Sequence, residues 1–257
     1  MTTLSRRQLL LGLGAIGACS AGAGFGSVGY LTDRERAPNV TTAGTLDLKL
    51  GYRSTYNGEP LASAPGEDEG VDCDTPGLVD GDGVPVVELA DVKPGDCGTL
   101  TTTLYVCGNP SRLWLAVDIA ESAENDRRPE EVAAGDGTPD AGELGALVDV
   151  TVRVDADGTD RVLYDGTLVG LATAAGSGLL LTRDDDGPTC EAGALTVTVD
   201  WCLPLDGRDH NRAITDSVAF DCRFAAIQCR HDPGGRPPFE PADDDGIAAP
   251  ANEAATR

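Results

Sequence analysis

The chain has two histidines, His210 and His231, and imidazole is the side chain that zinc peptidases use most often as a ligand. Those enzymes usually place two histidines one helical turn apart, with a glutamate base beside them. His210 lies in a predicted turn over residues 206–211, and His231 ends the last predicted strand, so we interpret both as surface residues. Ser177 sits in a small-residue turn without the flanking pattern of a nucleophile elbow. The sequence therefore predicts no catalytic residue and no enzyme.

Calcium is the metal that the acidic turns could bind. Residues 80–83 and 136–143, the latter ending at Glu143, combine carboxylates with glycine, and Asp155, Asp157 and Asp160 form a third such turn. Carboxylate oxygens on glycine-containing loops are typical calcium ligands, but none of these segments completes the twelve-residue EF-hand spacing. Asp-Gly is also an ordinary hairpin turn. The turn interpretation is favoured, and the prediction is no cofactor, with calcium at Asp155, Asp157 and Asp160 as the alternative.

Eight cysteines point to disulfide chemistry. Cys19 lies in the N-terminal apolar region, and seven follow it: Cys73, Cys97, Cys107, Cys190, Cys202, Cys222 and Cys229. Such a density is typical of proteins that mature in an oxidising compartment. Structural zinc would require close-set ligand pairs, which these spacings lack. Because seven is odd, we predict three bridges and one spare thiol, and Cys222 falls on the predicted inner face of its strand.

The N-terminal region has the features of an export signal. Arg6 and Arg7 precede an apolar run from Leu9 to Ile16 and small residues as far as Gly29, which falls short of the roughly 20 strongly apolar residues of a membrane-spanning helix. We predict removal by signal peptidase and a location outside the cell or at its surface. The twin arginines fit either the Tat route or an ordinary basic n-region.

Cys19 allows two interpretations. The preceding residues resemble a lipobox, which would make Cys19 a lipid-bearing first residue. The small apolar run continues through Gly29, however, as it does in signals that are cut later. Membrane contact is therefore expected either transiently during export or through a lipid at Cys19.

Composition excludes one large class of partners. The chain carries 43 acidic and 19 basic residues, for a formal net charge of -24. Such a surface keeps a protein hydrated when salt screens ordinary repulsion, which is typical of halophiles. Nucleic-acid binding requires clustered lysine and arginine, and no basic stripe exists.

The period of the apolar residues is two, which predicts strands with one buried face and one wet face. Eight segments show it: 46–50, 84–92, 100–106, 113–119, 148–154, 179–182, 195–201 and 218–228. Short strands without crossover helices predict an all-β fold, a two-sheet antiparallel jelly-roll (Greek-key) sandwich. Residues 121–145 are predicted to be a long surface insertion with room for one short helix.

Four parts of the chain are expected. They are an export signal at 1–30, an N-terminal segment at 31–43, the jelly-roll domain at 44–231 and a disordered acidic tail rich in proline and glycine at 232–257. The tail lacks the apolar residues that a packed core requires.

Several motifs, in order, resemble one family. Residues 29–35 are similar to the end of SipW-type signal peptides, and residues 43–48 are similar to the opening of mature TasA/camelysin proteins. Residues 93–96 resemble that family's Lys-Pro-Gly-Asp turn. Further motifs resemble the haloarchaeal branch: residues 107–110, 142–144, 215–218 and 228–231.

The resemblance implies a jelly roll and a filament or extracellular-matrix subunit. Such subunits assemble by strand exchange, in which the N-terminal segment of one molecule completes the sheet of the next. The candidate donor here includes Tyr30 and Leu31, for which we expect no place in the chain's own sheet, although Pro38 disfavours a fully paired strand. Self-assembly is the main prediction. A monomeric surface binding module, with or without a lipid anchor, is the alternative, and a camelysin-like metallopeptidase is third.

Overall fold

The computed structural model describes residues 30–32, 46–66, 70–80, 84–156, 159–183, 189–205, 210–231 and 236–239. Most of the predicted signal, including Cys19, lies outside these residues. Within the predicted tail, Phe239 lies against the domain, with the Arg223 guanidinium carbon 5.1 Å from the centre of its ring.

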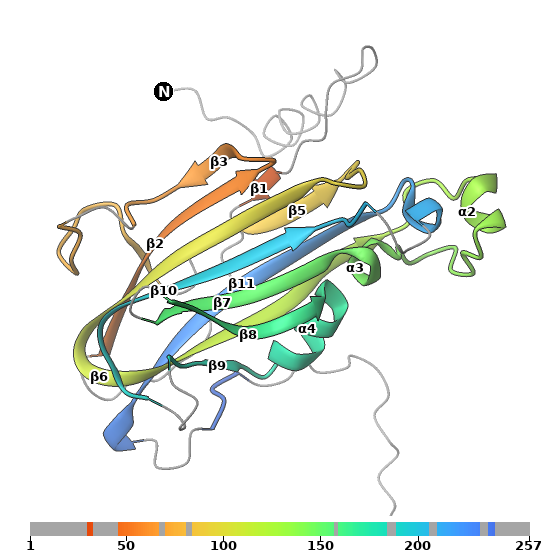
Figure 1. The fold of residues 1–257 in the computed structure, drawn as a ribbon. Helices are drawn as coiled ribbons and strands as arrows, with labels where there is room; N and C mark the ends of the chain where they lie inside the picture. Colours follow the sequence, from red (N-terminus) through yellow and green to blue (C-terminus); the bar gives the residue numbers. More distant parts are fainter. Residues whose placement is uncertain are drawn as a thin grey trace, which may run out of the picture.

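One long strand, β6 (Cys97–Ala123), organises the molecule (Figure 1). Its first half pairs with β2 (Leu46–Tyr56) and β10 (Glu191–Cys202), and its second half pairs with β11 (Ser217–Gln228) and β9 (Leu179–Leu181). The sequence predicted two strands here. The structure has one continuous strand instead. It bends near Gly108, whose φ is +129°, and passes from one sheet into the other.

The strands form two antiparallel layers that share β6. The first layer has the order β3-β2-β6-β10-β7-β8, and β4 also pairs with β2; the strands not yet defined are β3 (Glu59–Ser63), β4 (Val79–Asp80), β7 (Asp149–Ala156) and β8 (Thr159–Thr167). The second layer has the order β1-β5-β11-β6-β9, with β1 (Tyr30–Thr32) and β5 (Val86–Ala90). The sets β5-β11-β6-β9 and β6-β10-β7-β8 have the strand order of a jelly roll. The predicted fold class is confirmed.

The core lies between these two layers. Alternate residues of β10 and β7 point inward from the first layer, and alternate residues of β6 and β11 point inward from the second. The fully buried side chains include Leu195, Val197, Val152, Val154, Leu113, Leu115 and Phe220. The period-two pattern therefore identified the buried face correctly.

Short helices close the ends of the sandwich. They are α2 (Pro129–Ala133), α3 (Leu144–Leu147), α4 (Leu168–Ala175), and the 3-10 turns η1 (His210–Ala213) and η2 (Cys229–His231). The insertion at 121–145 is mostly exposed and holds the short helix α2, as predicted; beyond the prediction, it also contains the start of α3 and buries Glu131 and Asp136. Among the described residues no helix is long and apolar enough to cross a membrane.

The candidate donor segment has a place in the chain's own sheet, which corrects the expectation that it had none. β1 pairs antiparallel with β5, and Tyr30, Leu31 and Thr32 lie opposite Glu88, Val87 and Val86. β1 therefore forms the edge of the second layer (Figure 1).

The turn at residues 93–96 ties the strands together at one end. Asp96 accepts hydrogen bonds from the Lys93 backbone N–H (2.8 Å), the Tyr56 hydroxyl (2.5 Å) and the Asn57 amide (2.8 Å). Asn57 and Gly58 both have positive φ, as the two central residues of a type I′ hairpin turn require. The carboxylate of Asp96 thereby fixes the β2–β3 hairpin against the start of β6.

Candidate functional site

The outer face of the first layer is rich in threonine. Because Leu100 and Leu104 point inward, Thr101 and Thr103 point outward on the same strand. The register with β10 sets Thr101 opposite Thr198 and Thr103 opposite Thr196. The two hydroxyl oxygens of the second pair are 3.2 Å apart. Rows of hydroxyl groups therefore lie on paired strands, where Thr101, Thr196 and Thr198 are half-buried and Thr103 is buried.

Residues 63–66 cross this face and turn it into a groove. Gly51 permits the crossing, because a Cβ there would lie 1.8 Å from the Pro65 carbonyl oxygen. The Tyr105 hydroxyl donates to the Gly66 carbonyl (2.8 Å) and holds the segment in place. The hollow of about 700 Å³ is lined by Gly51, Tyr52, Arg53, Pro60, Ser63, Ala64, Pro65, Gly66, Thr101 and Thr103.

Arg53 supplies the charge of this groove. Its side chain is exposed, and the strand register places it opposite Ser63 on one side and Thr101 on the other. Within the part of the chain that the structure describes, Arg53 forms no ion pair, although the whole chain carries a net charge of -24. A planar guanidinium can donate two parallel hydrogen bonds to a carboxylate or to neighbouring hydroxyls.

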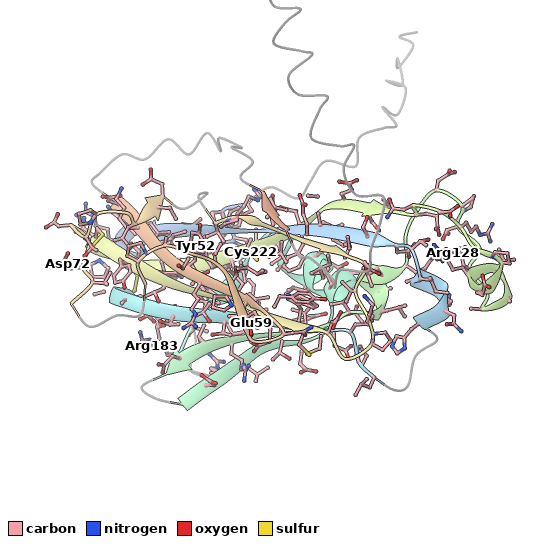
Figure 2. All side chains as sticks on the ribbon, turned by 90° about the horizontal axis from the view of Figure 1, so that it is seen from above. Tyr52, Glu59, Asp72, Arg128, Arg183 and Cys222 are labelled. Atoms are coloured by element: carbon pink, nitrogen blue, oxygen red, sulfur yellow. A yellow bond between two sulfur atoms is a disulfide. The ribbon has the colours of Figure 1, made fainter. Side chains whose placement is uncertain are left out.

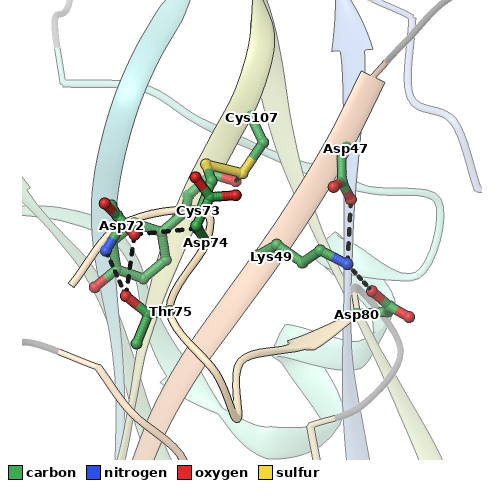
Figure 3. The surroundings of a disulfide bond; sticks show 9 residues. Asp47, Lys49, Asp72, Cys73, Asp74, Thr75, Asp80 and Cys107 are labelled. Atoms are coloured by element: carbon green, nitrogen blue, oxygen red, sulfur yellow. Dashed lines mark hydrogen bonds and ion pairs between the residues drawn. A yellow bond between two sulfur atoms is a disulfide. The ribbon is translucent and has the colours of Figure 1, made fainter.

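A disulfide anchors the loop that follows the groove wall (Figure 3). Cys73 is bonded to Cys107 on β6, close to the bend between the sheets. Beside it, the Asp72 carboxylate accepts from the Asp74 backbone N–H (3.1 Å) and from the Thr75 hydroxyl (3.2 Å). Covalent anchoring of this loop reduces the flexibility of the groove.

Two further bridges fasten β10. Cys97–Cys202 joins residues that face each other in the β6–β10 register, and Cys190–Cys229 joins the residue before β10 to the turn after β11. Cys222 is free and buried, and burial raises the pKa of its thiol above the ordinary value, so the thiolate nucleophile is disfavoured. The prediction of three bridges and one spare thiol is confirmed.

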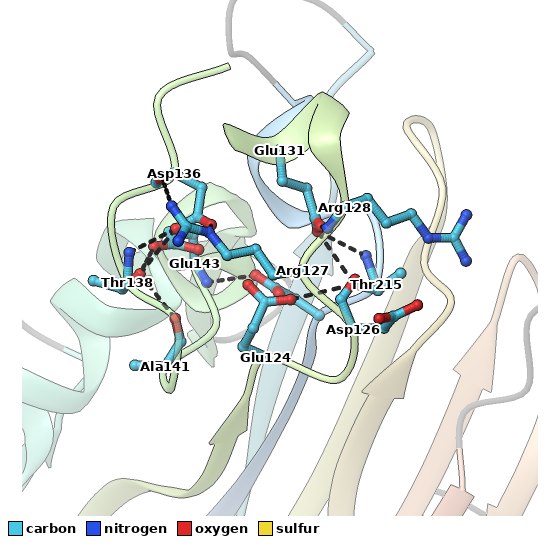
Figure 4. Close-up of polar contacts among 11 residues, drawn as sticks. Glu124, Asp126, Arg127, Arg128, Glu131, Asp136, Thr138, Ala141, Glu143 and Thr215 are labelled. Atoms are coloured by element: carbon cyan, nitrogen blue, oxygen red, sulfur yellow. Dashed lines mark hydrogen bonds and ion pairs between the residues drawn. The ribbon is translucent and has the colours of Figure 1, made fainter. Parts of the chain in front are cut away.

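A second group of polar side chains lies at the other end of the sandwich (Figures 2 and 4). Five carboxylates meet there: Glu124, Glu131, Asp136, Glu143 and Asp216. We call them the acidic cluster. They come from the end of β6, from α2, from the loop to α3 and from the residue before β11. Carboxylate oxygens of Glu124, Asp136 and Glu143 lie within 4.8 Å of one another, and so do those of Glu124, Glu131 and Asp216.

Two members of the acidic cluster have partners on both oxygens. Glu131, which is 0% exposed, accepts from the Arg128 backbone N–H on one oxygen and from Thr215 on the other, through its N–H (3.2 Å) and hydroxyl (3.2 Å). Burial alone would raise the pKa of Glu131, but these hydrogen bonds outweigh it and lower the pKa. The Thr138 backbone N–H (2.8 Å) and the Arg127 guanidinium lower the pKa of Asp136.

The other three members each keep one oxygen without a partner. These buried oxygens are Glu124 Oε2, Glu143 Oε2 and Asp216 Oδ1. Asp216 is only 2% exposed, and its other oxygen accepts from the Glu143 backbone N–H (2.5 Å). Burial first, and then the charges of Glu124, Glu143 and Glu131, raise the pKa of Asp216 to about 7. Burial and the charge of Glu131 also raise the pKa of Glu124.

The turn that the sequence offered as the alternative calcium site lies outside the acidic cluster. Asp155 and Asp160 face each other in the β7–β8 register and are exposed, and Asp157 lies outside the described residues. The segment is a hairpin, as the turn interpretation required, and calcium there stays a prediction. Of the predicted turns, the one at 136–143 contributes Asp136 and Glu143 to the acidic cluster, whereas Asp216 comes from residues that carried no metal prediction.

The histidines and Ser177 were the other residues considered for metal binding or catalysis. Among the described residues, His210 joins no group of three metal-ligating side chains, and the side chain of His231 lies outside what the structure describes. His210 is half-buried, not a surface residue as expected, and its buried Nε2 has no hydrogen-bond partner. Ser177 is exposed in the turn after α4.

Comparison with family models gave no match, and comparison with curated proteins gave none either. Among solved structures, the chain has a likeness to TmCBM61, described in complex with β-1,4-galactotriose, at 15% identity and a TM-score of 0.28. The likeness covers 57% of this chain and 72% of that one.

Proposed function

We propose that the protein is a non-catalytic surface binding module that acts outside the cell. Its groove, between residues 63–66 and the threonine face, takes an extended hydroxyl-rich chain such as a polysaccharide, and Arg53 contacts an acidic group of that ligand. The observation that carries the proposal is the exposed Arg53 in a groove of about 700 Å³ lined by hydroxyls, backbone and proline. The three disulfides support an oxidising compartment.

Rigidity supports a binding role for this groove. Its floor is paired strand on both sides of Thr101, its wall is held by the bond from Tyr105 to Gly66, and the next loop is fixed by Cys73–Cys107. A preformed groove loses little conformational entropy when a ligand binds. Paired hydroxyl groups and an arginine can replace the water that hydrates sugar hydroxyls and carboxylates.

The test compares neutral and uronic-acid polysaccharides by calorimetry and affinity electrophoresis in molar salt. Arg53→Ala should weaken binding of the acidic polysaccharide by about tenfold or more, because a charge-assisted hydrogen bond contributes about 1.5–3 kcal/mol. Thr101→Val removes a hydroxyl without changing the side-chain shape and should weaken both ligands. Arg128→Ala is the matched control, since Arg128 is exposed at the opposite end of the sandwich (Figure 2). Binding to neither polysaccharide, or equal losses in Arg53→Ala and Arg128→Ala, would contradict the proposal.

Self-assembly is the second candidate, and the β1–β5 pairing favours it. The segment that the resemblance marked as a donor does complete the sheet at β5, and residues 33–45 separate it from β2. The same pairing made with β5 of a neighbouring molecule would be strand exchange, and a head-to-tail contact that does not close generates a filament. Membership of the TasA/camelysin family stays a prediction that rests on the sequence motifs.

Electron microscopy and sedimentation of the secreted protein separate the two candidates. If β1 is exchanged, the full secreted chain forms concentration-dependent fibres, and deletion of residues 30–32 abolishes them while leaving a folded monomer. A synthetic peptide of residues 30–39 should then bind the shortened chain. A full chain that stays monomeric at every concentration would remove the second candidate. The metallopeptidase remains third, and casein cleavage that stops with chelator would support it.

A further inference from the structure

The acidic cluster has more negative charge than its protein partners can neutralise. Arg127 pairs with Asp136, whereas no residue in the described ranges provides an ion pair for Glu124, Glu143 or Asp216. The Arg128 side chain, the next cation along the chain, points away from the cluster in Figure 4. A carboxylate taken out of water needs hydrogen bonds, a proton or a cation beside each oxygen, and Glu131 shows the first of these.

The unpartnered oxygens indicate where a cation would bind. Every oxygen of Glu131 and Asp136 accepts a hydrogen bond from the protein. These two residues are therefore already satisfied without a cation. Glu124 Oε2, Glu143 Oε2 and Asp216 Oδ1 are buried and accept none. Asp216 is 98% buried, so its free oxygen differs from those of ordinary surface carboxylates, which bulk water hydrates.

We propose that Glu124, Glu143 and Asp216 bind one calcium ion. Glu124 shares one group of carboxylates with Glu143 and the other with Asp216, so its oxygens lie within 4.8 Å of both other ligands. Calcium holds its oxygen ligands at about 2.3–2.6 Å, so two ligands on opposite sides are up to about 5 Å apart. The donors are all oxygen, with no histidine or cysteine in either group, which favours a hard cation over zinc. Calcium tolerates irregular geometry, whereas magnesium demands a near-ideal octahedron.

The ion would tie together three parts of the chain. Glu124 follows the end of β6, Glu143 precedes α3, and Asp216 precedes β11. Two contacts already bring these parts together: Glu143 N–H donates to Asp216, and Ser122 donates to the Gly142 carbonyl (2.9 Å). Gly142 is required for this approach, since a Cβ there would lie 2.6 Å from the Ala123 carbonyl oxygen. A bound ion would hold the insertion at 121–145 against the sheet.

The test is calcium titration of the metal-free protein by calorimetry in molar potassium chloride at pH 8, with the melting temperature as a second readout. We expect one ion per chain and a rise in melting temperature that chelator reverses. Glu143→Gln and Glu124→Gln should each weaken binding by about tenfold or more, because each removes a charged ligand. Circular dichroism before the titration establishes that each variant is folded, and two separate ligand variants guard against one that is not.

Two controls separate a specific site from general acidity. Glu130→Gln removes an exposed carboxylate of α2 next to Glu131, and Asp155→Asn with Asp160→Asn removes two carboxylates of the alternative calcium turn. Both should bind calcium as the wild type does. The proposal is overturned if the wild type takes up no calcium at millimolar concentration, if the ligand variants bind it unchanged, or if tenfold excess magnesium displaces it.

Discussion

Replacing Asp216 by Asn should stabilise the metal-free protein, and the gain should grow with pH. A carboxyl whose pKa is about 7 when folded and 3.8 when unfolded favours folding fully only below pH 3.8, and that contribution is lost as the pH rises towards 7. Each tenfold ratio corresponds to about 1.4 kcal/mol, so relative to low pH the raised pKa lowers the free energy of unfolding by about 2 kcal/mol at pH 5 and about 4 kcal/mol at pH 8. These are upper bounds, since solvent and salt screen the repulsion.

Urea unfolding in chelator and molar salt, at pH 5, 6, 7 and 8, measures the difference in free energy of unfolding between Asp216→Asn and wild type. The asparagine keeps an acceptor for the Glu143 backbone N–H and removes the charge, so its stability should exceed that of wild type most at pH 8. Glu131 and Asp136 have lowered pKa values, so their contributions are lost only as the pH falls below about 4.5, outside this window. A gap that does not change with pH, or an asparagine variant that is less stable at pH 8, would refute the reasoning.

Three further results are expected. Removing the Cys97–Cys202 bridge by paired serine substitutions should lower the free energy of unfolding by about 4–5 kcal/mol in urea titrations, because it closes a loop of 105 residues. Removing Cys73–Cys107, with a separation of 34, should cost about 3–4 kcal/mol; a larger loss than for the first pair would contradict the loop argument. Cys222 should resist iodoacetamide until the chain unfolds, and mass spectrometry should then find one alkylated thiol; rapid labelling of folded protein would place it outside the core.

The period of two predicted most of the sandwich, because one face of each inner strand packs on the core. It failed at the bend of β6, where Gly108, Asn109 and Pro110 have the composition of a turn. The structure uses them to bend a continuous strand between two sheets, and sequence composition alone does not distinguish these two uses. The jelly-roll order was still correct, because each half of β6 pairs as a separate strand would.

Three elements, β3, β8 and α4, were not predicted from the sequence, each for a physical reason. Asn57-Gly58 is a strong hairpin signal that could have located β3, and its positive φ angles show the expected turn. β8 mixes Asp160, Arg161 and an exposed Val162, so an edge strand of this kind has little alternation to detect. α4 spans eight residues, too few for a helical period to appear clearly.

The acidic cluster shows why local spacing is a poor guide to metal chemistry in so acidic a chain. The chain has 43 acidic residues, which keep its surface hydrated, so Asp-rich turns are frequent. A short motif such as Asp155 to Asp160 therefore does not by itself indicate a metal site. Glu124, Glu143 and Asp216 are distant in sequence, and only folding brings their oxygens together. Each of the three has one buried oxygen without a hydrogen-bond partner within a cluster of carboxylates, which costs free energy unless a proton or an ion is present. The asparagine variant replaces a charged ligand of the ion by a neutral one, so chelator should destabilise it less than it destabilises the calcium-loaded wild type.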